Sequence, residues 1–304
     1  ELKPAGEYLY GETDRVLTAL ELDQRFIEGD PSLGAVRCAA FIQCVGSRSA
    51  ERPYCSKVCC THSVVSALRL KELNPEAEVL VLYRDVCTYG LRECLYREAR
   101  ERGVIFVRYE EDRPPRVERK GDGLRLVVAS STLGRELELR PDLVVLATAM
   151  VAPRDNPVAQ LFKVPLNEDG FFVEAHVKLR PVDFTTDGVY VCGLAHCPKP
   201  LEESIAQARA AAARAATLLS QDRVLGNPIV AEIDPERCAG CQGCVKVCPY
   251  EAIRYVEERG VCEVNPMICK GCGTCAATCP SGSARLRGFT SSAIYAQIRA
   301  ALAA

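Results

Sequence analysis

In the first third of the chain, the spacing of hydrophobic positions switches between two patterns. Short apolar runs bounded by turn residues predict strands, and apolar positions three to four residues apart predict amphipathic helices. In chain order we expect a strand at 41–46, a helix at 62–73, a strand at 78–83, a helix at 91–102 and a strand at 104–109. Strands that alternate with helices form parallel sheets, so the pattern predicts an α/β fold with a Rossmann-like sheet.

The pattern changes after residue 110. Segments 124–130 and 137–140, joined by SSTLG, predict an antiparallel hairpin. An apolar strand at 143–150, a short strand at 187–193 and a long alanine-rich helix at 202–219 follow. A final helix is expected within the last residues of the chain. These elements extend the α/β pattern as far as residue 220.

Composition and charge exclude several classes of function. The chain has 304 residues, of which 48% are hydrophobic and 26% charged, as in an ordinary soluble protein of two domains. The formal net charge is −2 and no long basic run occurs, so we expect no nucleic-acid partner. The most apolar helical segment, 204–220, is interrupted by Arg209 and Arg214. We therefore expect no direct membrane insertion and a cytoplasmic location.

Cysteine is the exceptional residue, with 18 copies. A secreted disulfide-bonded protein is one explanation, but no signal-peptide pattern is present and the cysteines cluster at the spacing of metal ligands. Thiols in large proteins of reducing compartments serve metals and redox chemistry more often than disulfides. The count therefore favours metal centres.

The strongest motif is a repeated one near the end of the chain. CAGCQGCVKVCP (238–249) and CKGCGTCAATCP (269–280) both read C-x2-C-x2-C-x3-C-P. In two-cluster ferredoxins the fourth cysteine of each run binds the cluster held by the other run. This pattern assigns one [4Fe–4S] cluster to Cys238, Cys241, Cys244 and Cys279, and a second to Cys269, Cys272, Cys275 and Cys248.

The loops of this repeat suit an inorganic cluster. Glycines at 240, 243, 271 and 273 permit positive φ and close backbone approach. Zinc is the alternative, although eight thiols in two interleaved runs exceed what tetrahedral zinc needs. The duplication predicts an α+β ferredoxin-like domain at 227–287, preceded by the turn-like LGNPI at 225–229.

A second cysteine group, RPYCSKVCCTH (52–62), begins where a strand gives way to a helix. With Cys44 it reads C-x10-C-x3-C-C, and a helix start favours thiolates because its N–H groups carry partial positive charge. Spacing alone leaves three explanations open: an iron–sulfur cluster, a zinc site, or a buried cysteine pair. His62 is expected to be a helix-start residue rather than a ligand. The glycine pattern for a dinucleotide is absent, and VGSRSA (45–50) is a poor substitute.

Several segments together resemble a known family. LATAM (146–150) and TTDGVYVCG (185–193) look like flavin-domain segments of thioredoxin-reductase-type flavoproteins. FIQCVGSR, YCSKVCC, YRDVCTYG, PKPLEESIAQARAAAARA and CKGCGTCAATCPSG resemble the A subunit of heterodisulfide reductase, an iron–sulfur flavoprotein of methanogens and anaerobic bacteria. Members of that family begin with an FAD-binding half that is missing here. We therefore expect either a fragment or split subunit whose partner chain supplies that half, or an incomplete flavin site.

The resemblance implies cofactors and their contacts. It implies that Cys44, Cys55, Cys59 and Cys60 bind a third [4Fe–4S] cluster near FAD. The flavin would lie against Gly193 and Leu194 and against the start of the helix near Glu203, where the N–H groups of Ser204 and Ile205 would support negative charge. Lys199 is a candidate for tuning the flavin, with a solvated surface lysine as the alternative. The six other cysteines, at 38, 87, 94, 192, 197 and 262, are expected to be core or surface thiols.

Two positions depart from the family pattern. Leu194 stands where thioredoxin-reductase-type proteins usually carry an aspartate after the glycine, which weakens the transfer of a ribityl contact. Val65 stands five residues after the cysteine pair, where family members carry a lysine. A missing positive charge disfavours an anionic flavin, which puts flavin-based electron bifurcation in doubt.

The expected organisation follows from these assignments. Its parts are a remainder of the FAD domain at 1–34, a nicotinamide-domain-like Rossmann domain at 35–148, a second FAD-domain segment at 149–226, the ferredoxin domain at 227–287 and a C-terminal helix at 288–304. No arrangement typical of hydrolytic or acid–base catalysis is recognisable.

The expected function is electron distribution between FAD and [4Fe–4S] clusters in an oxidoreductase complex. The resemblance implies B and C subunits and a hydrogenase or formate dehydrogenase module as partners. A flavin-free polyferredoxin that relays electrons and organises a complex is one alternative. A quinone-interacting oxidoreductase subunit with a membrane partner is another.

Overall fold

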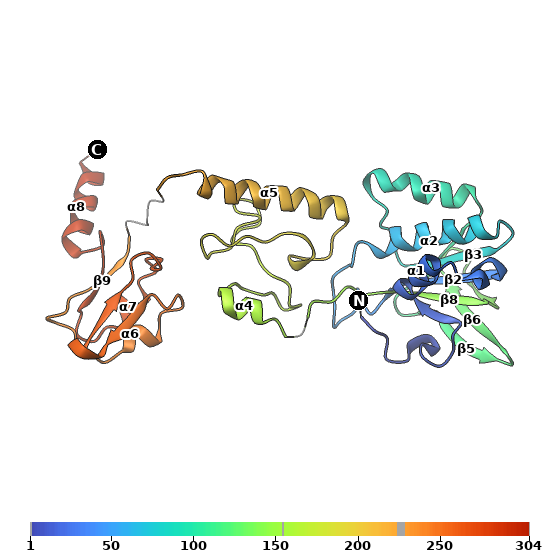
Figure 1. Ribbon diagram of the computed structural model, residues 1–304, viewed down its shortest axis with the longest axis horizontal. Coiled ribbons are helices and arrows are strands. Elements are labelled where there is room, and N and C mark those ends of the chain that lie inside the picture. The colour runs from blue at the N-terminus through green and yellow to red at the C-terminus, as the bar shows by residue number, and fades with distance from the viewer. Residues whose placement is uncertain (1, 154, 224–228, 304) are drawn as a thin grey trace. The chain divides into compact units, whose positions relative to one another are not determined.

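The computed structural model describes residues 2–153, 155–223 and 229–303, and the chain divides into two compact units, Glu1–Ala215 and Ala216–Ala304 (Figure 1). The expected domain boundary between residues 226 and 227 lies outside the described residues. The same is true of the turn-like segment 225–229, apart from Ile229. In the described part of the chain, no helix combines the length and the apolar character needed to cross a bilayer.

The first unit is built on a five-stranded sheet in which all neighbouring strands are parallel. The strand order is β1 (Val16–Thr18), β8 (Leu143–Thr148), β2 (Cys38–Val45), β3 (Glu78–Tyr83) and β4 (Ile105–Arg108). The expected parallel α/β sheet is confirmed. Its central strands are continuous apolar runs because both faces of the sheet are covered.

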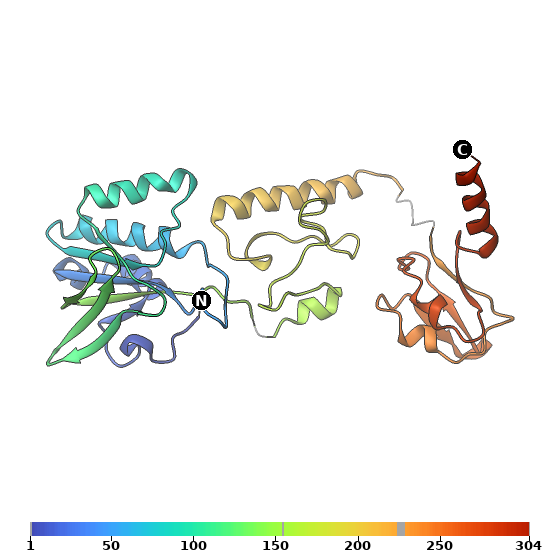
Figure 2. The same cartoon turned by 180° about the vertical axis from the view of Figure 1, so that it is seen from behind.

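Helices cover one face of this sheet and strands cover the other (Figure 2). The helices are α1 (Ala19–Glu28), α2 (Cys59–Leu73) and α3 (Glu93–Glu101). Thr18 starts α1 through a capping box, because its side chain accepts from the Glu21 N–H and the Glu21 carboxylate accepts from the Thr18 N–H. The helix expected at 62–73 begins three residues earlier, directly at the cysteine pair.

The opposite face packs against an antiparallel sheet of β5 (Arg116–Lys120), β6 (Gly123–Ser130) and β7 (Arg135–Leu139). The predicted β6–β7 hairpin is confirmed, with Leu126 and Val128 fully buried against the main sheet. Strand β5 has no apolar alternation in its sequence, RVERK, because it is an exposed edge strand, and the pattern therefore missed it.

Little regular structure occurs among the described residues between 151 and 200. Helix α4 (Pro157–Phe162) precedes a set of turns, and α5 (Leu201–Leu219) follows. The strand predicted at 187–193 is wrong: Tyr190 forms only an isolated bridge with Asp183. Val189 and Val191 alternate as in a strand, but they pack into a small apolar cluster with Phe184 and do not pair with a neighbouring strand.

The second unit contains two antiparallel strand pairs and the expected final helix, α8 (Ser291–Leu302). Strands β9 (Ala231–Ile233) and β12 (Ala284–Leu286) pair with each other, as do β10 (Ile253–Val256) and β11 (Val261–Val264). Short helices α6 (Gly243–Lys246) and α7 (Thr274–Thr278) lie within the two cysteine runs. Among the residues that the structure describes, 3-10 helices also occur at Glu7–Leu9, Pro31–Ala35, Gly90–Arg92, Gly193–Ala195 and Glu257–Arg259.

Candidate iron–sulfur centres and flavin site

One small cavity of the second unit collects four cysteines from both repeats. Cys248 of the first run and Cys269, Cys272 and Cys275 of the second line it, between apolar side chains that include Ile253 and Leu286. Backbone N–H groups already point at two of the sulfurs: Ala231 N lies 3.3 Å from Cys269 Sγ, and Ala252 N lies 3.3 Å from Cys248 Sγ. This donor set fits a [4Fe–4S] cluster with crosswise ligation.

Serine hydroxyls join the first and last cysteines of the other predicted set. Cys279 Sγ lies 3.5 Å from Ser281 Oγ and 3.4 Å from Ser283 Oγ, and the Ser283 hydroxyl also bonds to Cys238. Burial opposes ionisation of Cys279, but these hydrogen bonds and the Ser283 and Ala284 N–H groups outweigh it and lower its pKa to about 6. These hydrogen bonds therefore stabilise the thiolate of Cys279, and the thiolate is the form that binds iron.

Sequence reasoning missed Cys262, which lies beside this set. It is buried on β11 and is hydrogen-bonded to the thiols of Cys238 and Cys244. Burial is the main cause that raises its pKa, to about 12, and the neighbouring thiols add to it. Cys262 does not fit the cysteine spacing of the motif. It comes close to the other cysteines only because its strand, β11, pairs with β10.

Gly240 provides a test of how closely the backbone is packed around these ligands. Its φ is 66°, and a Cβ there would lie 2.6 Å from the Gly260 carbonyl oxygen. Gly288 has a comparable φ of 79° but open space around it. We expect Gly240→Ala to lower the free energy of unfolding by about 1–3 kcal/mol more than Gly288→Ala, because the second change adds backbone strain without a clash. Thermal and denaturant unfolding of both variants measures this; equal losses would contradict the close packing.

The third predicted set lies at the carboxyl end of β2 and the start of α2. The β2–β8 register shifts between Ile42 and Val45, and Cys44 adopts a positive φ of 62°, which takes it out of the regular strand alternation. Cys55 follows in the connecting loop and accepts from the Lys57 N–H at 3.3 Å. Cys59 and Cys60 form the buried first turn of α2, which has no side-chain cap. Ligands bind at this edge of parallel α/β sheets.

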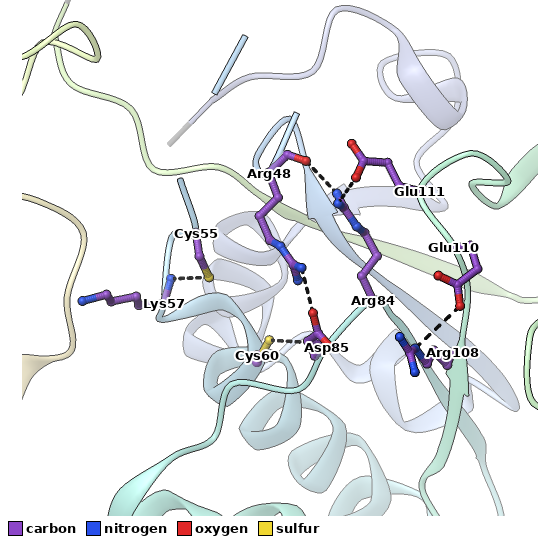
Figure 3. A network of polar contacts seen from close by, with 9 residues as sticks. All are labelled: Arg48, Cys55, Lys57, Cys60, Arg84, Asp85, Arg108, Glu110 and Glu111. Atoms are coloured by element: carbon purple, nitrogen blue, oxygen red, sulfur yellow. Dashed lines mark hydrogen bonds and ion pairs between the residues drawn. The ribbon is translucent and has the colours of Figure 1, made fainter. Parts of the chain in front are cut away.

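A positive charge faces these thiols (Figure 3). The Arg48 guanidinium bonds to Cys44 and pairs with Asp85 at 2.7 Å. The Asp85 carbonyl in turn accepts from Cys60 Sγ at 3.6 Å. Arg48 therefore links the loop after β2, through Asp85, to the cysteine pair.

The surroundings of Cys44, Cys55 and Cys60 favour the protonated thiol. Burial raises the pKa of Cys44 and that of Cys55, and hydrogen bonding to Cys59, together with burial, raises the pKa of Cys60 to about 12. If this set binds iron, the metal would displace these protons, and binding would be coupled to proton release.

Sequence reasoning also missed Cys87 as a neighbour of this set. Cys87 follows β3 and packs against Cys59 and Cys60, and its thiol is hydrogen-bonded to Cys55 and Cys60. The sequence spacing of Cys87 could not reveal this contact. Cys87 reaches the other cysteines only because β3 pairs with β2 in the folded sheet.

The described residues do not bring three or more His, Cys, Asp or Glu side chains together in a group that would hold a single metal ion. The four thiolates of an iron–sulfur cube bind four different irons and therefore stand further apart than ligands of one ion.

The expected flavin region contains a mostly apolar pocket of about 410 Å³. Its lining includes Met150, Phe171, Phe172, Leu194 and Pro198. An apolar pocket of this size can accept part of a planar ring system.

The polar contacts expected around the flavin are already used within the protein. Helix α5 begins at Leu201 rather than near Glu203, so the Ser204 N–H donates to the Pro200 carbonyl at 3.0 Å and Ile205 lies in the second turn. The Gly193 N–H donates to Gln207 Oε1 at 2.9 Å. The Ser204 and Gly193 N–H groups are thus bonded within the protein, and their contacts with a flavin stay predictions.

Lys199 is buried, so its alternative assignment as a solvated surface lysine is wrong. Its Nζ lies 2.9 Å from His196 Nδ1 and 2.6 Å from Gln207 Oε1, and His196 Nε2 pairs with Glu174 at 2.7 Å. This network satisfies the buried ammonium group. His62 is a helix-start residue, as expected, and pairs with Asp23 at 2.7 Å.

Residues 237–283 match the family model described as a 4Fe–4S dicluster domain. The chain is 41% identical to the second iron–sulfur A subunit of CoB–CoM heterodisulfide reductase from Methanopyrus kandleri, over 84% of this chain and 41% of that protein. It is 40% identical to the A subunit of H2:CoB–CoM heterodisulfide,ferredoxin reductase from Methanothermobacter marburgensis, over 83% of this chain and 40% of that protein. The resemblance to heterodisulfide reductase A subunits is confirmed.

The chain spans about two fifths of the length of these relatives, 41% for the protein from Methanopyrus kandleri. Val65, where the resemblance implies a lysine, lies on α2 with 37% of its surface exposed.

Solved structures are also similar to the chain. Thioredoxin reductase from T. acidophilum has a TM-score of 0.44 and 14% identity, over 73% of this chain and 64% of that chain. L-lysine 6-monooxygenase from Pseudomonas syringae has a TM-score of 0.45 and 15% identity, over 72% of this chain and 61% of that chain.

Proposed function

We propose that the chain is an electron-transferring oxidoreductase subunit of the heterodisulfide reductase type that holds three [4Fe–4S] clusters and contributes to an FAD site. The observation that carries this proposal is the group of thiols at the carboxyl edge of the parallel sheet, where a dinucleotide would otherwise bind. In a hydride-transferring relative this edge would hold a nicotinamide. Here it holds thiols, and an iron–sulfur cluster bound by them would exchange single electrons instead of hydride.

In this proposal the ferredoxin-type ligands are Cys238, Cys241, Cys244 and Cys279 for one cluster and Cys269, Cys272, Cys275 and Cys248 for the other. Cys44, Cys55, Cys59 and Cys60 hold the third. Clusters supply one-electron steps over a wide range of potentials, which the protein sets through charge and hydrogen bonds to sulfur. The chain's own contribution is to fix the thiolates, donate hydrogen bonds to them and exclude water.

The proposed partners are B and C subunits and a hydrogenase or formate dehydrogenase module, within a cytoplasmic complex. The names of two relatives pair H2, or H2 and formate, with the CoB–CoM heterodisulfide. Flavin-based electron bifurcation would be a more specific version of this function. Val65 argues against it here, because the α2 position offers no positive charge to a reduced flavin.

A flavin-free electron relay is the second candidate function. It is favoured by one observation: the Gly193 and Ser204 N–H groups are already bonded within the protein. Against it stands the apolar pocket beside Leu194, which suits a ring system.

Flavin analysis separates the two candidates. The chain is purified anaerobically, alone and together with a co-expressed first FAD-binding half from a relative, and FAD is released and quantified. The flavoprotein proposal expects bound FAD in at least the second preparation. FAD in neither preparation would leave only the relay.

Arg48 is expected to raise the potential of the third cluster, because a positive charge stabilises the more negative, reduced form. Arg48→Gln should lower the midpoint potential by up to about 60 mV, equivalent to about 1.4 kcal/mol for one electron. Redox titration followed by EPR measures the shift. Lys57→Gln is the matched control, since it removes the same charge from a side chain directed away from Cys55 and Cys60 (Figure 3). Equal shifts in both variants would contradict a specific role for Arg48.

A further inference from the structure

The loop after β3 brings a fifth thiol to the third cysteine set. Cys87 packs against Cys59 and Cys60, and its thiol is hydrogen-bonded to Cys55 and Cys60. It comes from a different strand connection than the four predicted ligands. The site is therefore a five-cysteine group assembled from β2, the start of α2 and the end of β3.

The position of Cys87 is fixed from both sides. On one side, Asp85 pairs with Arg48 at 2.7 Å, and its carbonyl accepts from Cys60 Sγ at 3.6 Å. On the other, Thr88 is buried and its hydroxyl donates to Glu93 Oε2 at 3.2 Å. Cys94, only seven residues further on, is exposed and its thiol bonds to the Leu91 carbonyl. Proximity to the cysteine pair is thus specific to Cys87.

A [4Fe–4S] cube has four irons and takes four thiolates, so one of the five thiols is surplus. We propose that Cys87 is a reserve ligand, which binds iron in place of Cys55 when Cys55 is lost. Cys55 is the ligand it replaces because both residues lie in connecting loops and their thiols are in contact, whereas Cys59 and Cys60 are fixed in a helical turn. This inference rests on the proposed third cluster.

The test uses the full chain, purified anaerobically, with iron counted per chain and the reduced protein examined by EPR. Wild-type, Cys87→Ala and Cys55→Ala proteins are expected to retain about twelve irons each, and Cys55→Ala/Cys87→Ala about eight. Cys55→Ala/Cys94→Ala is the matched control and should retain about twelve, because Cys94 lies away from the group. The EPR signal of the third cluster should persist with altered g values in Cys55→Ala and disappear in the first double variant.

Other results would overturn the inference in distinguishable ways. About eight irons in Cys55→Ala alone would show that Cys87 cannot replace it, and about eight in Cys87→Ala alone would make Cys87 a permanent ligand. About eight irons in the wild-type chain would overturn the third cluster itself, and with it the proposed function. Retention of the ferredoxin-type EPR signals and of the circular dichroism spectrum in every variant shows that iron loss is not caused by unfolding.

Discussion

Replacing Cys59 with alanine is expected to remove about four of about twelve irons per chain, together with one of three EPR signals. Cys59 lies in the buried first turn of α2, against Cys60 and Ala147. The helix fixes its sulfur, and the hydrogen bonds of Cys87 go to Cys55 and Cys60 instead. Loss of Cys59 therefore leaves one iron of the cube without a protein ligand.

Cys94→Ala is the matched control for this variant, because Cys94 is an exposed thiol of the same unit. It should keep about twelve irons. A Cys59→Ala protein that also keeps about twelve irons and all three signals would exclude Cys59 from the ligands. The small change in side-chain volume, from one methylene and a sulfur to a methyl group, is expected to leave the fold intact.

Two double variants are expected to reveal crosswise ligation in the second unit. Cys248→Ala/Cys269→Ala should leave about eight irons, because both residues would serve the same cluster. Cys248→Ala/Cys244→Ala should leave about four, because each would serve a different one. The physical basis is the cavity that Cys248 shares with Cys269, Cys272 and Cys275, although Cys248 belongs to the first run.

The two double variants control for each other, since both remove two cysteines from the same small unit. Ligation within each run would reverse the result, with about four irons left in Cys248→Ala/Cys269→Ala and about eight in Cys248→Ala/Cys244→Ala. Zinc in place of iron in the wild-type chain would contradict both assignments. Metal analysis by mass spectrometry distinguishes these outcomes.

The parts of the fold that sequence predicted best are those with strong local signals. The buried strand at 78–83 has the bounds found in the structure, and the hairpin at 124–140 pairs as expected, because apolar period and turn residues agree there. The segment 187–193 has the same apolar alternation, yet it forms no strand. Its valines pack into a local cluster, and alternation alone does not supply a pairing partner.

The residues of the candidate sites also differ in how well the sequence predicted them. The ferredoxin runs could be assigned from spacing because each cysteine lies within a few residues of the next. Cys87 and Cys262 could not, since each reaches the other cysteines only through strand pairing, β2 with β3 in one case and β10 with β11 in the other. Lys199 was ambiguous for a related reason. In the fold, its buried side chain bonds to His196 and Gln207, which lie on different segments of the chain.

The central claim is that this chain holds a third iron–sulfur cluster at the edge of a Rossmann-like sheet. Iron per chain, determined under strict anaerobiosis and interpreted with EPR of the reduced protein, tests it most directly. We predict about twelve irons and a third signal beside the two ferredoxin-type signals. About eight irons, with only the two ferredoxin-type signals, would contradict it.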